Sequence, residues 1–221
     1  MCGRFTLYAD PEFIQDELDI ENEDWKSNLS PSYNVAPTQQ VLTIVKGKKK
    51  SRAGLMKWGL IPFWAKDASV GYKMINARCE TIFEKPSYKH LVNKRHCIIV
   101  ANGFYEWKKE NNKKQPYYIQ SDLERPLLFA GLWDRYVKGE QTFITCTIIT
   151  RQANEKMEKL HHRMPVILHE GNWKNWLHPS DHSFEQLNQA FFNEDVSLHY
   201  FPVSTKVNKP INNSVDCLNP L

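Results

Sequence analysis

A long apolar run is missing from this sequence of 221 residues, and its mean hydropathy is −0.57. A membrane-spanning helix needs about 20 consecutive apolar residues, so none is expected. The first six residues, MCGRFT, lead directly into mixed polar sequence without the apolar region of a secretory signal peptide. We therefore expect a soluble, cytoplasmic protein that has no membrane partner.

Paired cysteines are missing as well. The five cysteines form no C-x-x-C pair, and their odd number does not fit a disulfide framework. A zinc site is not supported, and we expect neither a metal nor a cofactor. Cys97 and Cys146 lie in apolar runs and are expected to be small core residues. Cys2 lies at the extreme N-terminus, so it is considered separately.

Charge of one sign does not dominate. The chain has 29 lysines and arginines against 25 aspartates and glutamates, a net charge of +4. A balance this mild permits a nucleic-acid partner but does not indicate one. The densest basic run, KGKKKSR over residues 46–52, lies between two apolar runs and is expected to be a solvated hairpin tip.

What is present is a series of short β runs separated by turn residues, in ordinary globular composition with 41% hydrophobic residues. Strands are expected over residues 5–8, 41–45, 51–57, 96–107, 116–120, 127–136, 141–150 and 198–203. Helices are expected over residues 11–18, 86–93, 153–161, 173–177 and 183–192, and irregular segments over 28–40 and 58–75. Without a repeat or a break in composition, we predict one α+β domain over residues 1–221. It has a large, mainly antiparallel β-sheet or barrel-like core and peripheral helices.

Cys2 offers chemistry that an internal cysteine does not. If Met1 is removed, an α-amine and a thiol belong to the same residue. This 1,2-aminothiol adds to an aldehyde to give an imine and then closes a stable thiazolidine ring. With an amine pKa of about 8, roughly a tenth of the amine is neutral near pH 7. The Met-Cys dipeptide alone does not establish such a function.

Eight segments give this cysteine a context. They are 1–5 (MCGRF), 33–39 (YNVAPTQ), 58–64 (WGLIPFW), 76–81 (NARCET), 103–107 (GFYEW), 130–133 (AGLW), 147–150 (TIIT) and 161–168 (HHRMPVIL). In this order they closely resemble the SRAP family, the SOS-response-associated peptidases or abasic-site processing proteins. The resemblance extends from Cys2 to about Val207, and the whole set in order makes it specific.

The resemblance implies a sensor and covalent trap of abasic sites in single-stranded DNA, which is then the expected partner of a monomeric protein. Cys2 would capture the aldehyde of the open abasic sugar as a thiazolidine crosslink. Asn76 would hold the sugar or the Cys2 amine, while Glu106 and His161 would transfer protons during capture and reversal. The resemblance further implies lyase-like chemistry, and the family's name implies an autopeptidase that releases Met1.

The same resemblance suggests how DNA is held. Arg4, Arg78 and Arg163 are the phosphate-binding candidates, since each lies inside a motif rather than in a run of charge. Trp64 would wedge or stack against bases beside the lesion, a contact worth about 1–3 kcal/mol per base. The other tryptophans of these motifs, Trp58, Trp107 and Trp133, are expected to be core residues.

Two positions depart from the family's pattern. Cys79 stands where a small residue such as alanine is common, and His162 stands where an acidic residue is frequent. Cys79 is expected to be an inert packing residue. The first histidine of the pair, His161, aligns with the family's histidine and is therefore preferred for the reaction.

Three other functions remain open from the sequence. An N-terminal-nucleophile amidohydrolase, such as a glutamine amidotransferase domain, also begins Met-Cys-Gly and uses the thiol to attack an amide. A non-catalytic single-stranded DNA-binding module would bind in a salt-sensitive way without forming a covalent product. A purely structural domain is the third alternative.

Overall fold

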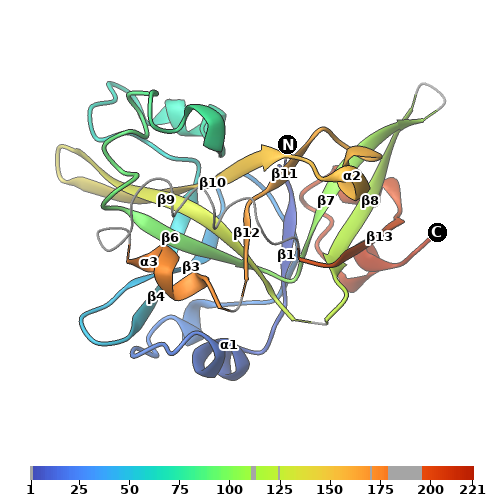
Figure 1. Ribbon diagram of the computed structural model, residues 1–221, viewed down its shortest axis with the longest axis horizontal. Helices are drawn as coiled ribbons and strands as arrows, with labels where there is room; N and C mark the ends of the chain where they lie inside the picture. The colour runs from blue at the N-terminus through green and yellow to red at the C-terminus, as the bar shows by residue number, and fades with distance from the viewer. Residues whose placement is uncertain (1, 111–112, 124, 170, 179–195) are drawn as a thin grey trace.

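The computed structural model describes all residues except 1, 111–112, 124, 170 and 179–195, and it contains two β-sheets (Figure 1). In the smaller sheet every neighbouring pair of strands is antiparallel, in the order β13-β8-β7-β1-β2. Its strands are β1 (Phe5–Leu7), β2 (Ser32–Val35), β7 (Gly103–Glu110), β8 (Lys113–Ser121) and β13 (Leu198–Pro202).

Five strands of the larger sheet close into a barrel. They are β3 (Gln40–Lys46), β4 (Ser51–Trp58), β6 (His96–Ala101), β9 (Leu127–Lys138) and β10 (Gln141–Gln152). The pairings run from β3 to β4, β10, β9, β6 and back to β3, so each strand has a hydrogen-bonded neighbour on both sides. Of these five pairings the one between β4 and β10 is parallel. The expected α+β class with a mainly antiparallel, barrel-like core is confirmed.

Strand β10 is longer than its barrel partners β3, β4 and β6, and it carries further short strands. β4 ends at Trp58 beside Cys146, and β5 (Asn76–Arg78) continues along β10 in parallel, with Asn76 opposite Ile148. Farther on, β11 (Arg163–Pro165) pairs with the last residues of β10. β12 (Ile167–Leu168) adds to β9. One strand therefore positions two segments that lie far apart in the sequence.

Alternation along the barrel strands separates two hydrophobic clusters. One face, with Ile98 and Ile149, packs in a cluster with residues of α1 and α3, which cover the barrel from outside. The other face forms the interior and includes Cys97 and Cys146, which are fully buried as expected. The described helices are α1 (Pro11–Glu17), α2 (Glu155–Glu158), α3 (Trp173–Leu177), and the 3₁₀ helices η1 (Lys26–Asn28), η2 (Ala68–Lys73), η3 (Cys79–Thr81), η5 (Thr205–Asn208) and η6 (Val215–Leu218). No helix of the described residues is long and apolar enough to cross a membrane.

Several local predictions need correction. The segment 28–40, expected to be irregular, contains β2 because its backbone pairs with β1. The segment 86–93, expected to be a helix, is a series of turns. The single strand expected over 96–107 is two strands, since Asn102 turns the chain and its Oδ1 accepts hydrogen bonds from the backbone N–H groups of Tyr8 and Ala9.

Other local predictions agree better with the structure. The hairpin around the basic run is confirmed by β3 and β4, which extend to Lys46 and begin again at Ser51. The helices expected at 11–18 and 173–177 are present as α1 and α3, while α2 is shorter than the helix expected over 153–161. The helix expected over 183–192 lies outside the described residues.

Candidate active site

The pairing of β1 with β7 determines where Cys2 lies. The two strands are antiparallel with Phe5 opposite Phe104, and the N–H of Tyr105 donates to the carbonyl of Arg4 at 2.9 Å. Residues that precede Phe5 therefore run back alongside the residues that follow Tyr105. Cys2 is fully buried in the same hydrophobic cluster as Phe5. The N-terminal segment is thus led from the small sheet into the interior.

Aromatic contacts hold this segment against the barrel. The Phe5 ring lies 5.0 Å from the ring of Trp58 on β4 and 6.1 Å from that of Phe129 on β9, centroid to centroid. Phe104 also contacts Phe129, at 5.9 Å. Edge-on and tilted pairs of this kind add about 0.5–1.5 kcal/mol each beyond burial.

Asn76 reaches Cys2 from the barrel side. Its Nδ2 donates a hydrogen bond of 2.8 Å to the carbonyl oxygen of Cys2. Its Oδ1 is buried and has no hydrogen-bond partner among the described residues. An unsatisfied buried amide oxygen is unfavourable by about 1–3 kcal/mol, which a donor from a ligand would relieve. The amide is therefore suited to hold a group beside Cys2.

Glu106 on β7 is the carboxylate of the site. It is 2% exposed, and burial raises its pKa to about 7. The positive charge of the amino terminus and the N–H of Trp107 lower the pKa in part. Near pH 7 both forms of this carboxyl group are populated, which suits a group that both takes and gives a proton.

His161 lies between α2 and β11 and is held by the backbone. Its Nδ1 accepts a hydrogen bond of 3.0 Å from the N–H of Arg163, so a neutral ring carries its proton on Nε2. Burial lowers the pKa of His161 to about 4, and the positive charge of the amino terminus acts in the same direction. His162 is exposed and stacks on it with ring centroids 4.3 Å apart. Near pH 7 the His161 ring is therefore neutral.

Glu106 and His161 line one open cavity of about 430 Å³. A volume of this order fits a small-molecule group such as a sugar. The other residues that line it are Trp107, Lys114 and Asn208. These three were not predicted as site residues. The strands expected from the sequence end at Trp107 and begin again at residue 116, so Lys114 was not placed on a strand. Nothing in the sequence indicated that Asn208 packs beside Trp107.

The tryptophans differ from their expected core roles in two of three cases. Trp58 is fully buried, as expected. Trp107 is half-buried, and its Nε1 donates to the Oδ1 of Asn208 at 2.7 Å. The Arg4 guanidinium lies 5.9 Å from its ring. Trp133 is also half-buried, with the Arg95 guanidinium 4.2 Å from its ring. Trp107 therefore belongs to the cavity wall rather than to the core.

The three arginines predicted to bind phosphate have different surroundings. Arg4 Nη1 donates to the Oδ1 of Asn34 and to the carbonyl of Val207, each at 2.7 Å. Arg78 is exposed and lies two residues after Asn76 on β5, so both side chains project from the same face.

Arg163 is buried and paired within the chain. Its Nη1 lies 2.5 Å from Glu80 Oε1 and its Nη2 3.0 Å from Oε2, and Nη2 also donates to the Thr150 carbonyl at 2.7 Å. In this arrangement the Arg163 side chain, which is 8% exposed, joins β11 to η3 and β10 rather than facing solvent.

Trp64 lies outside the cavity. It is 51% exposed and neighbours Phe63, which is 59% exposed. The backbone N–H of Phe63 donates to Asp134 Oδ2 at 3.0 Å, and its ring meets the His90 ring edge-on at 5.1 Å. This leaves the Trp64 ring at the surface, beyond the residues that line the cavity with Glu106.

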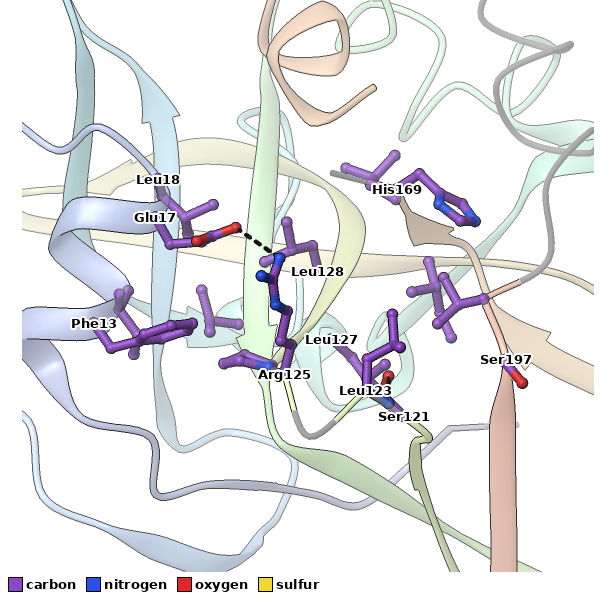
Figure 2. Close-up of a pocket in the computed structure, with 16 residues that line it drawn as sticks. Phe13, Glu17, Leu18, Ser121, Leu123, Arg125, Leu127, Leu128, His169 and Ser197 are labelled. Carbon is purple, nitrogen blue, oxygen red and sulfur yellow. Dashed lines mark hydrogen bonds and ion pairs between the residues drawn. The ribbon is translucent and has the colours of Figure 1, made fainter. Parts of the chain in front are cut away.

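A second cavity lies away from Cys2, between α1, the start of β9 and β13 (Figure 2). Phe13, Leu123 and Leu128 are among its apolar lining, and Arg125 pairs with Glu17 at 3.6 Å across it. Its polar lining residues are Glu17, Ser121, Arg125, His169 and Ser197. Within the described part of the chain no cluster of histidine, cysteine or acidic residues could hold a metal ion.

Solved structures share this arrangement of barrel and sheet. A crystal structure of a protein from Bacteroides thetaiotaomicron superposes with a TM-score of 0.87 at 27% identity, covering 100% of both chains. A phage-related protein from Bordetella bronchiseptica superposes with a TM-score of 0.73 at 27% identity, covering 92% of this chain and 95% of that one. The fold is therefore that of a group of bacterial and phage-related proteins.

Residues 1–210 match the family model described as SOS response associated peptidase (SRAP), and the chain belongs to this family. It is 44% identical to the abasic site processing protein YoaM of Bacillus subtilis, over 99% of this chain and 98% of that protein. It is 30% identical to the abasic site processing protein HMCES of Xenopus tropicalis, over 99% of this chain and 78% of that protein.

Proposed function

We propose that this protein senses abasic sites in single-stranded DNA and traps them covalently through Cys2 once Met1 is removed. The observation that carries the proposal is the convergence of three groups on the N-terminal segment. Asn76 binds the Cys2 carbonyl, the negative charge of Glu106 raises the pKa of the Cys2 thiol, and His161 lines one cavity with Glu106. The names of the relatives, abasic site processing proteins, support the same substrate.

The reaction uses the open-chain form of the abasic sugar. Ring opening frees the C1′ aldehyde, and the Nε2–H of neutral His161 is suited to donate to the sugar oxygen at this stage. The Cys2 amine adds to the aldehyde carbon, and the carbinolamine loses its hydroxyl as water to leave an imine. Glu106, populated in both protonation states near pH 7, accepts the amine proton and returns it to the departing hydroxyl.

The thiol acts last. Burial and the negative charge of Glu106 raise the pKa of the Cys2 thiol above its ordinary value, while the N–H of Arg4 lowers it in part. The thiol is therefore protonated at rest and does not compete with the amine. When the sulfur adds to the imine carbon, its proton goes to the nitrogen through Glu106 and the C–S bond closes the thiazolidine. The net change is aldehyde plus aminothiol giving thiazolidine plus water, and reversal runs the same steps backward.

DNA contacts are proposed from the arginines and Trp64. Arg78 is exposed on the face of β5 that also carries Asn76, so it is placed to bind a phosphate next to the lesion. Trp64 offers a surface ring on which a base can stack. Arg4 and Arg163, which the sequence suggested as phosphate ligands, make hydrogen bonds within the chain, so we assign them to positioning Trp107 and His161 respectively.

The test is a denaturing gel of the processed protein with single-stranded DNA that carries one abasic site. A shifted band is expected with the unmutated protein and with Cys79→Ser, a thiol variant outside the cavity. The band is expected to vanish in Cys2→Ala. An undiminished band in Cys2→Ala overturns the proposal, whereas salt-sensitive binding without any stable product favours a non-catalytic DNA-binding module.

Release of Met1 by the chain itself is a second proposal, which the burial of Cys2 supports. A fully buried residue 2 gives an external aminopeptidase poor access to the bond between residues 1 and 2. Intact mass spectrometry of purified, unprocessed protein refolded alone tests this. Loss of Met1 is expected with the native sequence and not with Cys2→Ala; retention of Met1 by the refolded native sequence contradicts it.

A further inference from the structure

The β7–β8 hairpin extends from the small sheet beyond the rest of the molecule (Figure 1). Its register is continuous, with Trp107 opposite Pro116, Lys109 opposite Lys114 and Glu110 opposite Lys113. Because side chains alternate along each strand and directly opposite residues share a face, one face carries Trp107, Lys109 and Lys114.

The other face of the hairpin is partly neutralised by an acidic residue of its own. Lys108 pairs with Glu110 at 3.0 Å, and the hydroxyl of Tyr117 donates to the same carboxylate at 3.1 Å. Lys113 stands opposite Glu110 across the ladder. The acidic residue Glu110 is therefore placed against the lysines of one face only.

On the first face two like charges stand directly opposite each other. Lys109 and Lys114 are both exposed, and the described residues provide neither with an ion pair. A directly opposed pair of like charges is destabilising in a sheet by a few tenths of a kcal/mol or more. An unneutralised pair on a projecting hairpin is the electrostatic arrangement expected of an anion-binding surface.

Two residues of this face line the cavity of the proposed active site, although Glu106 itself alternates to the other face of β7. Lys114 lines the same cavity as Glu106 and His161. Trp107, two residues before Lys109 on the same face, lines that cavity as well. When the reacting sugar of a polyanionic strand occupies the cavity, the part of the strand outside the cavity would therefore lie next to both lysines.

We infer that Lys109 and Lys114 form a surface that binds the sugar-phosphate backbone of single-stranded DNA beside the captured sugar. This rests on the proposed function, since it assigns the path of the same strand. The partner is a polyanionic strand rather than a single phosphate. Two flexible lysines side by side supply positive charge, but they lack the rigidly placed hydrogen-bond donors that hold a single phosphate. Their contribution is to binding and not to the chemical step.

Counterion release makes the inference measurable. Each phosphate neutralised on a single strand contributes about 0.7 to the slope of log affinity against log salt concentration. Removing both lysines is therefore expected to lower the magnitude of that slope by roughly 1.4, and the affinity for undamaged DNA at low salt by about tenfold. Undamaged single-stranded DNA reports this without any crosslink.

The experiment compares two double variants by fluorescence anisotropy with a labelled, undamaged oligonucleotide over a range of salt. Lys109→Gln with Lys114→Gln removes the proposed surface. Lys108→Gln with Lys113→Gln removes the same charge from the other face of the same hairpin. The first pair is expected to reduce the slope and the second to leave it within about 0.5 of the native value. Far-ultraviolet circular dichroism checks that both remain folded.

Equal changes in the two double variants overturn the inference, since net charge alone then explains them. An unchanged slope in the first double variant also overturns it. Crosslinking to abasic DNA at saturating oligonucleotide separates this from the proposed function. If the proposed function fails, the native protein forms no crosslink whatever the slopes are. If only the inference fails, crosslinking persists while the two faces of the hairpin behave alike.

Discussion

The side-chain amide of Asn76 donates to the backbone carbonyl of Cys2 at 2.8 Å, although 74 residues separate them in the chain. This bond joins the barrel, through β5, to the N-terminal segment that β1 draws alongside β7. Two independent sheets thus meet at residue 2. The first prediction follows from removing that link.

Asn76→Ala is expected to slow crosslink formation by about 5–30-fold, the effect of losing an interaction of about 1–2 kcal/mol. Affinity for undamaged single-stranded DNA should change little, because the amide faces Cys2 rather than solvent. Single-turnover crosslinking on denaturing gels measures the rate. Asn93→Ala, at an exposed asparagine, is the matched control. Equal rates in the two variants would contradict the role of Asn76.

Glu106→Gln is expected to lower the crosslinking rate by about 10²–10⁴-fold. It should also remove the part of the pH dependence that is due to Glu106 and leave the rise due to the Cys2 amine, whose pKa is about 8. In the native protein the rate should rise with pH through about 7, because burial raises the pKa of Glu106 to about 7 and the ionised form is the base. Glu110→Gln, on the same strand but partly exposed, should keep the native profile. A Glu106→Gln variant with the same pH profile as the native protein would refute the assignment.

The free energy of unfolding should change with pH in the opposite direction to the crosslinking rate. The folded pKa of Glu106 lies above the unfolded value, so the folded state binds more protons and its stability is lost as pH rises from about 4.5 to 7. Glu106→Gln, which stays neutral, should therefore raise the free energy of unfolding at pH 8 by up to roughly 3 kcal/mol, at about 1.4 kcal/mol per pKa unit. The gain should vanish near pH 4.5. Urea unfolding at both pH values tests this, and a variant that is less stable than the native protein at pH 8 contradicts it.

The two adjacent histidines offer a matched pair of variants. His161→Ala should slow capture or reversal by at least about tenfold without weakening DNA binding, because its ring lines the cavity. His162→Ala should change these rates by less than about threefold, since the exposed ring only stacks on its neighbour. Rates that fall equally in both variants would assign the effect to stacking rather than to proton transfer.

Variants of two arginines should distinguish an effect on DNA binding from an effect on stability. Arg78→Gln is expected to weaken binding and reduce the salt slope by about 0.7 without loss of stability. Arg163→Gln should destabilise the protein by about 1–3 kcal/mol, because it removes the hydrogen bonds of the buried guanidinium to Glu80 and to the Thr150 carbonyl. Thermal unfolding and anisotropy on both proteins give the comparison. A stable Arg163→Gln with weakened DNA binding would restore its phosphate-binding role.

Local patterns in the sequence predicted much of the fold, and their failures have specific causes. The β3–β4 hairpin was predictable because two apolar runs flank one basic tip. β2 was not, because its stability comes from outside the segment: the Asn34 amide donates to the carbonyls of Val207, Lys209 and Asn212, at the other end of the chain. No local pattern carries that information.

The candidate site, like the fold, was predicted only in part from the sequence. Cys2, Asn76, Glu106 and His161 were named through the family's motifs, and the structure places them around the N-terminal segment. Their separate motifs contain no information about which arginine is buried, so Arg163 and Arg78 looked equivalent. Trp107 was assigned to the core because a tryptophan on a strand is usually buried, whereas here it lines the cavity beside Asn208.

The packing of Phe5 on Trp58 has one further consequence. Cys2 is tethered by only three peptide units to a ring that is wedged between two strands of the barrel. These three peptide units limit how far the amine and thiol of Cys2 can move. The damaged strand must therefore enter the interior to react with them. A smaller side chain at position 5 would loosen the N-terminal segment. The amine and thiol of Cys2 would then be positioned less precisely, although every reacting group was still present.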